Sequence, residues 1–191
     1  EARLRKQIKA VAEVNQQLED EGIDFRLLTG SEVDISTDGD LDFDDDLLAE
    51  LDVVVASVHQ SFQLEEKKMT ARILKAAANP HVHMIGHLTG RILLSREAYK
   101  VNHQEIIDAC AGTGTWIELN ASPYRFDMDW RHWQYAKSKG VKTAINCDAH
   151  RFEHAGHLRL GAGIARKGWL TKDDVMNTLS LTELKAALAK K

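Results

Sequence analysis

Short apolar runs rich in β-branched residues alternate with amphipathic segments along most of the chain, and this alternation constrains the fold more than any other feature. The apolar runs are residues 25–28 continuing to Val33 and Ile35, then 53–58, 82–85, 115–119 and 141–145. Between them, segments 65–78, 103–111 and 130–139 have the apolar spacing of helices. Such alternation is typical of a parallel sheet with crossover helices. The sequence therefore predicts an α/β fold, either a doubly wound sheet or part of a (β/α) barrel.

Both ends of the chain are expected to be helical. Residues 1–21 have a helical apolar period but begin without an initiating Met or a capping residue, so we expect further sequence upstream. Near the other end, Thr171 and Ser180 each precede an acid three residues later, which is the spacing of a capping box. No repeat, low-complexity tract or linker interrupts the chain, and residues 1–191 are expected to belong to a single domain.

Composition narrows the class of protein. The chain is 43% hydrophobic and 28% charged, an ordinary globular mixture, and its net charge of −4 is spread without a basic stripe. A nucleic-acid substrate would therefore have to be held by local arginines or by metal ions. The longest apolar stretches, such as 51–58, are far shorter than the roughly 20 residues of a membrane helix, so we expect no membrane and a cytoplasmic location. Cys110 and Cys147 form no C-x-x-C pair, which argues against a disulfide scaffold or a cysteine zinc site.

Polar residues gather where each predicted strand ends. In chain order these are Glu32 and Asp34, Ser57 and His59, Gly86 and His87, Glu118 and Asn120, and Asp148 and His150. In both candidate architectures the chemistry lies at the carboxyl ends of the strands. Imidazoles and carboxylates are the ligands of zinc, manganese and iron. A single histidine at a strand end is more often structural, but repetition at equivalent positions favours a metal cluster.

Spacing separates these histidines from others nearby. Asp148 and His150 project from the same face, with Cα atoms about 6.6 Å apart in an extended strand, close enough to serve one metal ion or two neighbouring ions. His81 and His83 lie too far from His87 to share an ion with it. We expect both at the opposite end of the strand, as surface residues.

Five segments follow one another in an order that can be compared with known families: Gly30-Ser31-Glu32-Val33-Asp34-Ile35, Leu51-Asp52-Val53-Val54-Val55-Ala56-Ser57-Val58-His59, Gly86-His87-Leu88-Thr89-Gly90-Arg91, Glu118-Leu119-Asn120-Ala121 and Asp148-Ala149-His150. In this order they resemble the successive motifs of the polymerase and histidinol phosphatase (PHP) superfamily. The strongest resemblance is to the C-terminal domain of bacterial family X DNA polymerases. It covers essentially the whole chain, including Ala165-Arg166-Lys167-Gly168-Trp169-Leu170 and Asn177-Thr178.

The resemblance implies a distorted seven-stranded (β/α) barrel, of which this chain is the C-terminal portion, and up to three divalent ions, Mn²⁺ or Zn²⁺. By the family's pattern Glu32 would bridge two ions, and His59 and His87 would complete the second. Asp148 would join the first, and His150 would bind the third. The family's remaining ligands, an H-x-H pair, a further His and the His of a D-H motif, belong to the first strands of the barrel and match no part of this chain.

The function implied by the resemblance is metal-dependent hydrolysis of phosphoesters. The leading expectation is a 3′–5′ exonuclease that trims DNA 3′ ends in DNA repair, linked covalently to an upstream polymerase module, with Glu32, Asp148 and His150 as catalytic residues. Arg91, Arg125 and Arg151 are candidates for gripping phosphate oxygens because a guanidinium can bind them bidentately. Two alternatives stay open, a phosphomonoesterase similar to histidinol phosphatase and a non-catalytic PHP scaffold.

Overall fold

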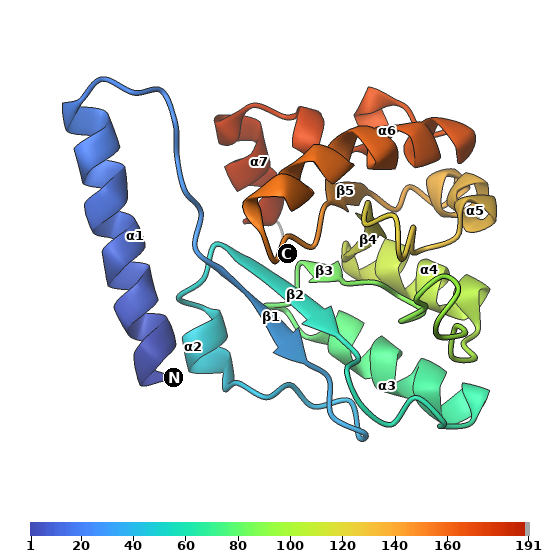
Figure 1. The fold of residues 1–191 in the computed structure, drawn as a ribbon. Helices are drawn as coiled ribbons and strands as arrows, with labels where there is room; N and C mark the ends of the chain where they lie inside the picture. The colour runs from blue at the N-terminus through green and yellow to red at the C-terminus, as the bar shows by residue number, and fades with distance from the viewer. Residues whose placement is uncertain (190–191) are drawn as a thin grey trace.

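Five parallel strands form one sheet in residues 1–189, the part of the chain that the computed structural model describes. The strands are β1 (Gly30–Asp34), β2 (Val53–Ser57), β3 (Met84–Ile85), β4 (Trp116–Asn120) and β5 (Thr143–Asn146), and their order in the sheet is their order in the sequence (Figure 1). A doubly wound sheet reverses this order at a switch point, whereas a (β/α) barrel advances by one strand at each crossover. The predicted α/β fold is confirmed, and the strand order favours the partial barrel.

One helix precedes β1, and others lie between the strands and after β5. They are α1 (Ala2–Asp20), α2 (Asp45–Leu48), α3 (Glu66–Ala78), α4 (His103–Thr113), η1 (Trp130–His132), α5 (Trp133–Ser138), η2 (Phe152–His157), α6 (Leu158–Lys167), η3 (Lys172–Asp174), η4 (Met176–Thr178) and α7 (Leu181–Leu188). The capping boxes expected at Thr171 and Ser180 are both present, at the starts of η3 and α7. No helix in residues 1–189 is long and apolar enough to cross a membrane.

Strand parity divides the buried apolar side chains between the two faces of the sheet. Val33 and Val54 belong to the larger core, which also contains Ile73 of α3, Ile106 of α4 and Trp133 of α5. On the other face, a smaller cluster joins side chains of β3, β4 and β5 to residues of η4 and α7: Met84, Trp116, Ala144, Met176 and Leu188. Because successive side chains of a strand point to opposite faces, burying Val33 on the helical side turns Glu32 and Asp34 to the other side.

The strand expected at residues 25–28 is wrong, because β1 begins only at Gly30. Phe25 is 60% exposed, and the backbone of Leu27 is bonded to a side chain instead of a neighbouring strand. The buried Asn15 of α1 accepts from Leu27 N at 2.8 Å and donates to Leu27 O at 3.0 Å. This tertiary contact replaces a ladder and outweighs the β propensity of the segment.

Candidate metal centre

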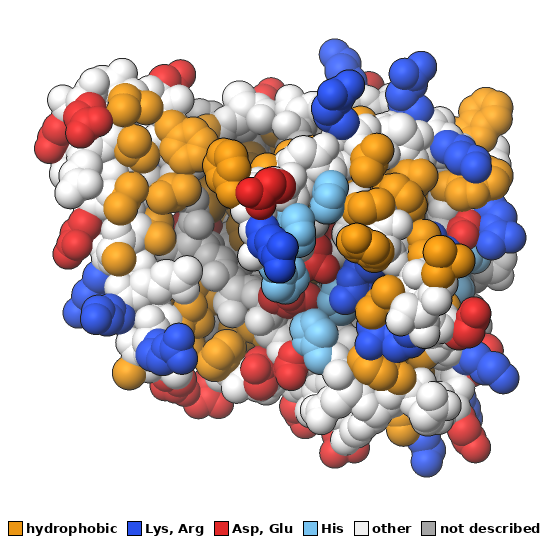
Figure 2. All heavy atoms as spheres, viewed as in Figure 1, with side chains coloured by type: hydrophobic (Ala, Val, Ile, Leu, Met, Phe, Trp, Pro, Cys, Tyr) orange, Lys and Arg blue, Asp and Glu red, His pale blue; other side chains and the backbone are white. Residues whose placement is uncertain are grey.

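Three side chains from three neighbouring strand ends converge on one point. Glu32 lies in β1, and His59 and His87 each lie two residues beyond the ends of β2 and β3. The Oε1 atom of Glu32 is 3.1 Å from His87 Nε2 and 3.5 Å from His59 Nε2, and the two Nε2 atoms are 3.2 Å apart. We call these residues the triad. Among residues 1–189 it is the one group of three such donors that could hold a single ion. Figure 2 shows histidines and acids gathered near the centre of the visible face.

The backbone at the end of β3 comes very close to this point. Gly86 precedes His87, and a Cβ atom added there would meet Ser57 Oγ at 2.3 Å, Val55 Cγ1 at 2.9 Å and Glu32 Oε1 at 3.5 Å. Any side chain at position 86 would force the side chains of Ser57 and Val55 in β2 to move. A glycine at position 86 therefore lets His87 come close to Glu32 and His59.

A second carboxylate orients the first imidazole. Asp34 Oδ1 lies 2.5 Å from His59 Nδ1, on the side of the ring opposite to Glu32. Histidines that bind metals usually donate their other ring N–H to a carboxylate, which fixes the tautomer and the ring orientation. The sequence placed Asp34 at a strand end but assigned it no role. Its position two residues after Glu32 in the same strand, and so on the same face of the sheet, could have indicated this role.

The electrostatics of the triad favour a positive charge. Hydrogen bonds from His59 and then His87 hold the pKa of Glu32 well below its ordinary range. The hydrogen bond to Glu32, with Asp34 on the other side, raises the pKa of His59 to about 9. Two imidazole nitrogens and one carboxylate oxygen are a donor set that suits divalent zinc or manganese, with room for water or substrate as further ligands. The residues present therefore fit a divalent cation.

A buried carboxylate supports the triad from β4. Glu118 is 5% exposed, and its Oε2 accepts from the backbone N of His87 at 2.7 Å and from Asn120 Nδ2 at 3.2 Å. Its Oε1 accepts from Asn146 Nδ2 at 2.9 Å. Burial raises the pKa of the Glu118 carboxyl. The sequence motif contained Glu118 and Asn120 but gave neither a role, and it did not point to Asn146.

Asp148 and His150 form a second group beside the triad. Asn120 Nδ2 joins Asp148 to Glu118, since it donates to Asp148 Oδ2 at 3.2 Å as well as to the carboxylate that holds the backbone of His87. His150 Nδ1 is 2.9 Å from the backbone O of Asp148, and its side chain is 78% exposed at the rim. Of the five predicted ligands, the structure thus brings three into direct contact, links Asp148 to them through Asn120 and Glu118, and leaves His150 on the outside.

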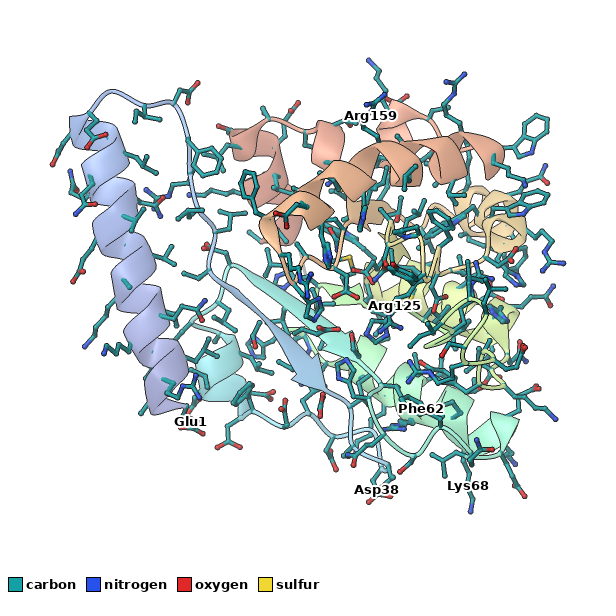
Figure 3. The ribbon with its side chains drawn as sticks, viewed as in Figure 1. Glu1, Asp38, Phe62, Lys68, Arg125 and Arg159 are labelled. Atoms are coloured by element: carbon teal, nitrogen blue, oxygen red, sulfur yellow. The ribbon has the colours of Figure 1, made fainter. Side chains whose placement is uncertain are left out.

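The three candidate arginines differ in their surroundings. Arg125 follows β4 (Figure 3), and its Nε lies 3.3 Å from Asp148 Oδ2. Arg151 is exposed. Arg91 is bound within the protein: Nε donates to Arg125 O at 2.8 Å, Nη1 to Asp129 Oδ2 at 2.9 Å, and Nη2 to Phe126 O. These contacts favour a role for Arg91 in bracing the 125–129 loop over the phosphate contact that its motif suggested.

His81 and His83 lie at the opposite end of the sheet, as predicted. His83 is not simply a surface residue, because its Nδ1 accepts from the backbone N of Val54 at 3.1 Å. The ring therefore anchors the start of β2 and takes no part in the triad.

Comparison with known proteins gives relatives of two kinds. No family model matches the chain. It is 40% identical to the DNA polymerase/3′-5′ exonuclease PolX of Bacillus subtilis over 97% of this chain and 32% of that protein. It is also 30% identical to a probable phosphatase of Thermoanaerobacter sp., over 83% of this chain and 65% of the phosphatase. A probable phosphatase of Caldanaerobacter subterraneus is 29% identical over 72% of this chain and 58% of the relative. The chain spans about a third of the first relative and about two thirds of the second.

The names of these relatives, a DNA polymerase/3′-5′ exonuclease and probable phosphatases, cover the two kinds of activity that the motif series implies. The fold and the triad agree with that relationship. The resemblance to the polymerase and histidinol phosphatase superfamily, and within it to the bacterial family X polymerases, is confirmed by a 40% identical match over 97% of this chain.

Proposed function

We propose that this chain holds the metal centre of a phosphodiesterase that removes nucleotides from DNA 3′ ends, in a protein that also carries a polymerase module. The triad is the observation that carries the proposal, because Glu32, His59 and His87 bring three donors around one point. The match to the Bacillus subtilis polymerase/exonuclease supports DNA as the substrate. Mn²⁺ or Zn²⁺ is the proposed ion, and the ligand pattern of the superfamily allows up to three.

The ion would be held by Glu32, His59 and His87, and when bound it lowers the pKa of a water and neutralises charge on the phosphate. Asp34 keeps the Nε2 atom of His59 directed at Glu32 and His87. Glu118 holds the backbone of His87 in place. These two carboxylates give the site its rigidity, which is the main contribution of a protein to phosphoryl transfer.

On the other side of the site, Asp148, His150 and Arg125 act on the substrate. Arg125 lies beside Asp148 and can turn its guanidinium to a phosphate oxygen that arrives there. The contact between His150 Nδ1 and the Asp148 carbonyl selects the tautomer protonated at Nδ1. That tautomer leaves the lone pair of Nε2 free to bind a further ion or to accept a proton.

Metal titration tests the centre directly. Calorimetry with Mn²⁺ should give one tight site in the wild-type chain, and His59→Asn and His87→Asn should each lose it. His81→Asn is the matched control, because His81 lies outside the triad at the other end of the sheet, and it should bind as the wild type does. Equal binding by His59→Asn and His81→Asn would contradict the assignment.

A phosphomonoesterase is the second candidate, and the probable phosphatases among the relatives favour it. The two functions can be distinguished by the substrate that the protein hydrolyses. The native protein with Mn²⁺ is expected to release mononucleotides from a 3′-labelled oligonucleotide and to act poorly on p-nitrophenyl phosphate. Rapid hydrolysis of the monoester without cleavage of the oligonucleotide would favour the phosphatase.

A further inference from the structure

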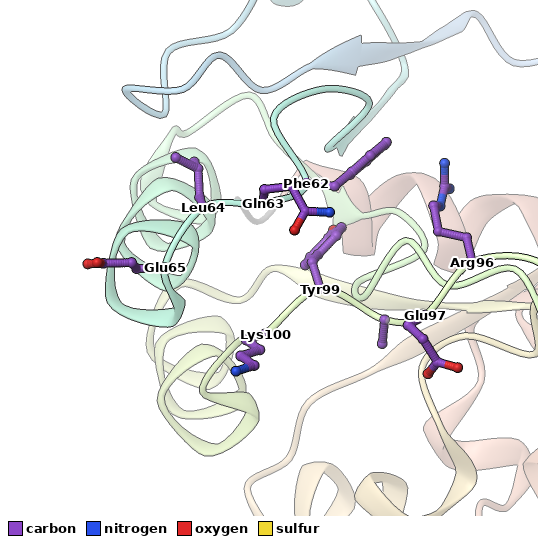
Figure 4. A pocket seen from close by; sticks show the side chains of 9 residues that line it. Phe62, Gln63, Leu64, Glu65, Arg96, Glu97, Tyr99 and Lys100 are labelled. Atoms are coloured by element: carbon purple, nitrogen blue, oxygen red, sulfur yellow. The ribbon is translucent and has the colours of Figure 1, made fainter.

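A pocket lies outside the triad and is built from different residues. It is a pocket of about 440 Å³ between residues 62–65, which follow β2, and residues 96–100, which follow β3 (Figure 4). This volume lies within the range of roughly 300–1,000 Å³ typical of small-molecule sites. None of the triad residues lines it.

Three flat groups form a stack in this pocket. The rings of Phe62 and Tyr99 are parallel within 8°, with centroids 5.9 Å apart. The guanidinium carbon of Arg96 lies 4.3 Å from the centroid of Phe62. Aromatic faces and guanidinium planes are the surfaces on which proteins stack nucleobases.

The stack is held firmly by the backbone that follows His87. Arg96 Nε donates to Gly90 O at 2.9 Å, and the backbone N of Tyr99 donates to Thr89 O at 3.1 Å. Gly90 has a φ of +58°, and a Cβ atom there would lie 2.5 Å from Tyr99 Cε1. A glycine is therefore needed for the tyrosine ring to pack against this turn. A rigid stack of this kind loses little conformational entropy when a planar ligand binds.

Both walls of the pocket are tied to the triad by short chain segments. Phe62 of one wall is three residues after His59, and Gly90, which accepts a hydrogen bond from Arg96 of the other wall, is three residues after His87. Three residues span at most about 11 Å. The pocket therefore lies within the reach of one nucleotide whose phosphate is at the triad.

The charges around the pocket favour a neutral ring over a second phosphate. Glu65 and Glu97 lie among the lining residues and balance Arg96 and Lys100. The amide of Gln63 adds a donor and an acceptor. An anion would meet two carboxylates here, whereas a base could lie on the guanidinium plane of Arg96, which the Phe62 ring supports from behind.

We propose that this pocket binds the nucleobase of the nucleotide whose phosphate is bound at the triad. The proposal rests on the proposed function, because it takes a nucleotide as the substrate. It assigns Phe62 and Arg96 to holding the base and gives them no part in breaking the bond.

Calorimetry with two ligands tests it on the chain loaded with Mn²⁺: dAMP and 2-deoxyribose 5-phosphate. We expect dAMP to bind about tenfold or more tightly than the sugar phosphate, as stacking of one base allows. In Phe62→Ala this ratio should fall towards one, while the affinity for the sugar phosphate stays unchanged. Phe62→Leu keeps the apolar volume without the aromatic face. In this variant, too, the ratio of the affinity for dAMP to that for the sugar phosphate should fall most of the way towards one. Arg96→Lys keeps the charge without the planar group and should lose part of it.

Phe25→Ala is the matched control, because Phe25 is an exposed aromatic residue outside this pocket, and it should keep the wild-type ratio. Equal affinities of the wild type for dAMP and the sugar phosphate, or an undiminished ratio in Phe62→Leu, would overturn the base pocket and leave the proposed function intact. If neither phosphate compound binds in the presence of metal, the proposed function fails and this inference fails with it.

Discussion

Asp34 and His59 face each other across the ends of β1 and β2, with Oδ1 and Nδ1 2.5 Å apart. The contact places the imidazole between two carboxylates, because Glu32 lies on the Nε2 side of the ring. Asp34 thus orients one of the ligands proposed for the metal ion, although it does not belong to the triad itself.

Replacement of this orienting carboxylate should weaken the metal site without disturbing the fold. In Asp34→Asn the affinity for Mn²⁺ should fall by about 10- to 100-fold, because the ring loses the anion that fixes its tautomer. Asp38→Asn, an exposed acid in the same segment, should bind Mn²⁺ normally. Calorimetric titration of both variants at matched circular dichroism checks this, and equal affinities would show that Asp34 has no orienting role.

Asp148→Asn should abolish phosphodiester cleavage in the native protein and leave the fold nearly as stable. The change removes an anion beside Arg125 and Asn120 while conserving the volume of the side chain. Mononucleotide release from a labelled oligonucleotide measures the effect, and Asp173→Asn, at an exposed acid, is the control. Wild-type turnover by Asp148→Asn with Mn²⁺ would show that Asp148 has no role in cleavage.

Arg91→Lys should destabilise the protein by about 1–3 kcal/mol, because lysine cannot reproduce a fork that reaches Asp129 and two backbone carbonyls. Arg131→Lys is a sharp control, since Arg131 contacts the same Asp129 from a side chain that is 71% exposed. In Arg131→Lys we expect the free energy of unfolding to fall by less than about 0.5 kcal/mol. Urea unfolding of both variants decides between a bracing role and a merely solvated arginine at position 91.

His103 should make the protein less stable in mild acid. Burial first, and then the neighbouring His132, lower the pKa of His103 to about 4. Their rings are stacked with centroids 3.9 Å apart, and Asp129 and Arg91 are the other charged groups that act on His103. The unfolded chain binds a proton near pH 6.5, before the folded state does, so stability falls as the pH drops from about 6.5 towards 4.

His103→Phe keeps a flat ring against His132 and removes this titration. The loss of stability between pH 7.5 and pH 5 should therefore be smaller in His103→Phe than in the wild type, as measured by urea midpoints. His81→Phe, at the far end of the sheet, should retain the full wild-type loss. An unchanged loss in His103→Phe would show that other groups cause the acid sensitivity.

The sequence was sufficient for the order of the elements and for much of the local chemistry. Alternation of apolar runs with helical periods predicted the parallel sheet, and the spacing at Thr171 and Ser180 predicted two capping boxes that are present. Period-two alternation also turns Glu32 and Asp34 away from the helices that cover Val33. These features depend on residues a few positions apart, whose relative directions follow from the geometry of the chain itself.

The tertiary structure decided which distant residues meet. The side chain of Asn15 binds the backbone of Leu27, which therefore does not join the sheet. Asp34 contacts His59, and Asn120 donates to both Glu118 and Asp148. Arg91 turned to the 125–129 loop, and Arg96 came to lie on Phe62. Most of these contacts have at least one partner in a loop, where no backbone period fixes the direction of a side chain. They depend on strand register and on single positions such as Gly86, where van der Waals space admits only a hydrogen atom.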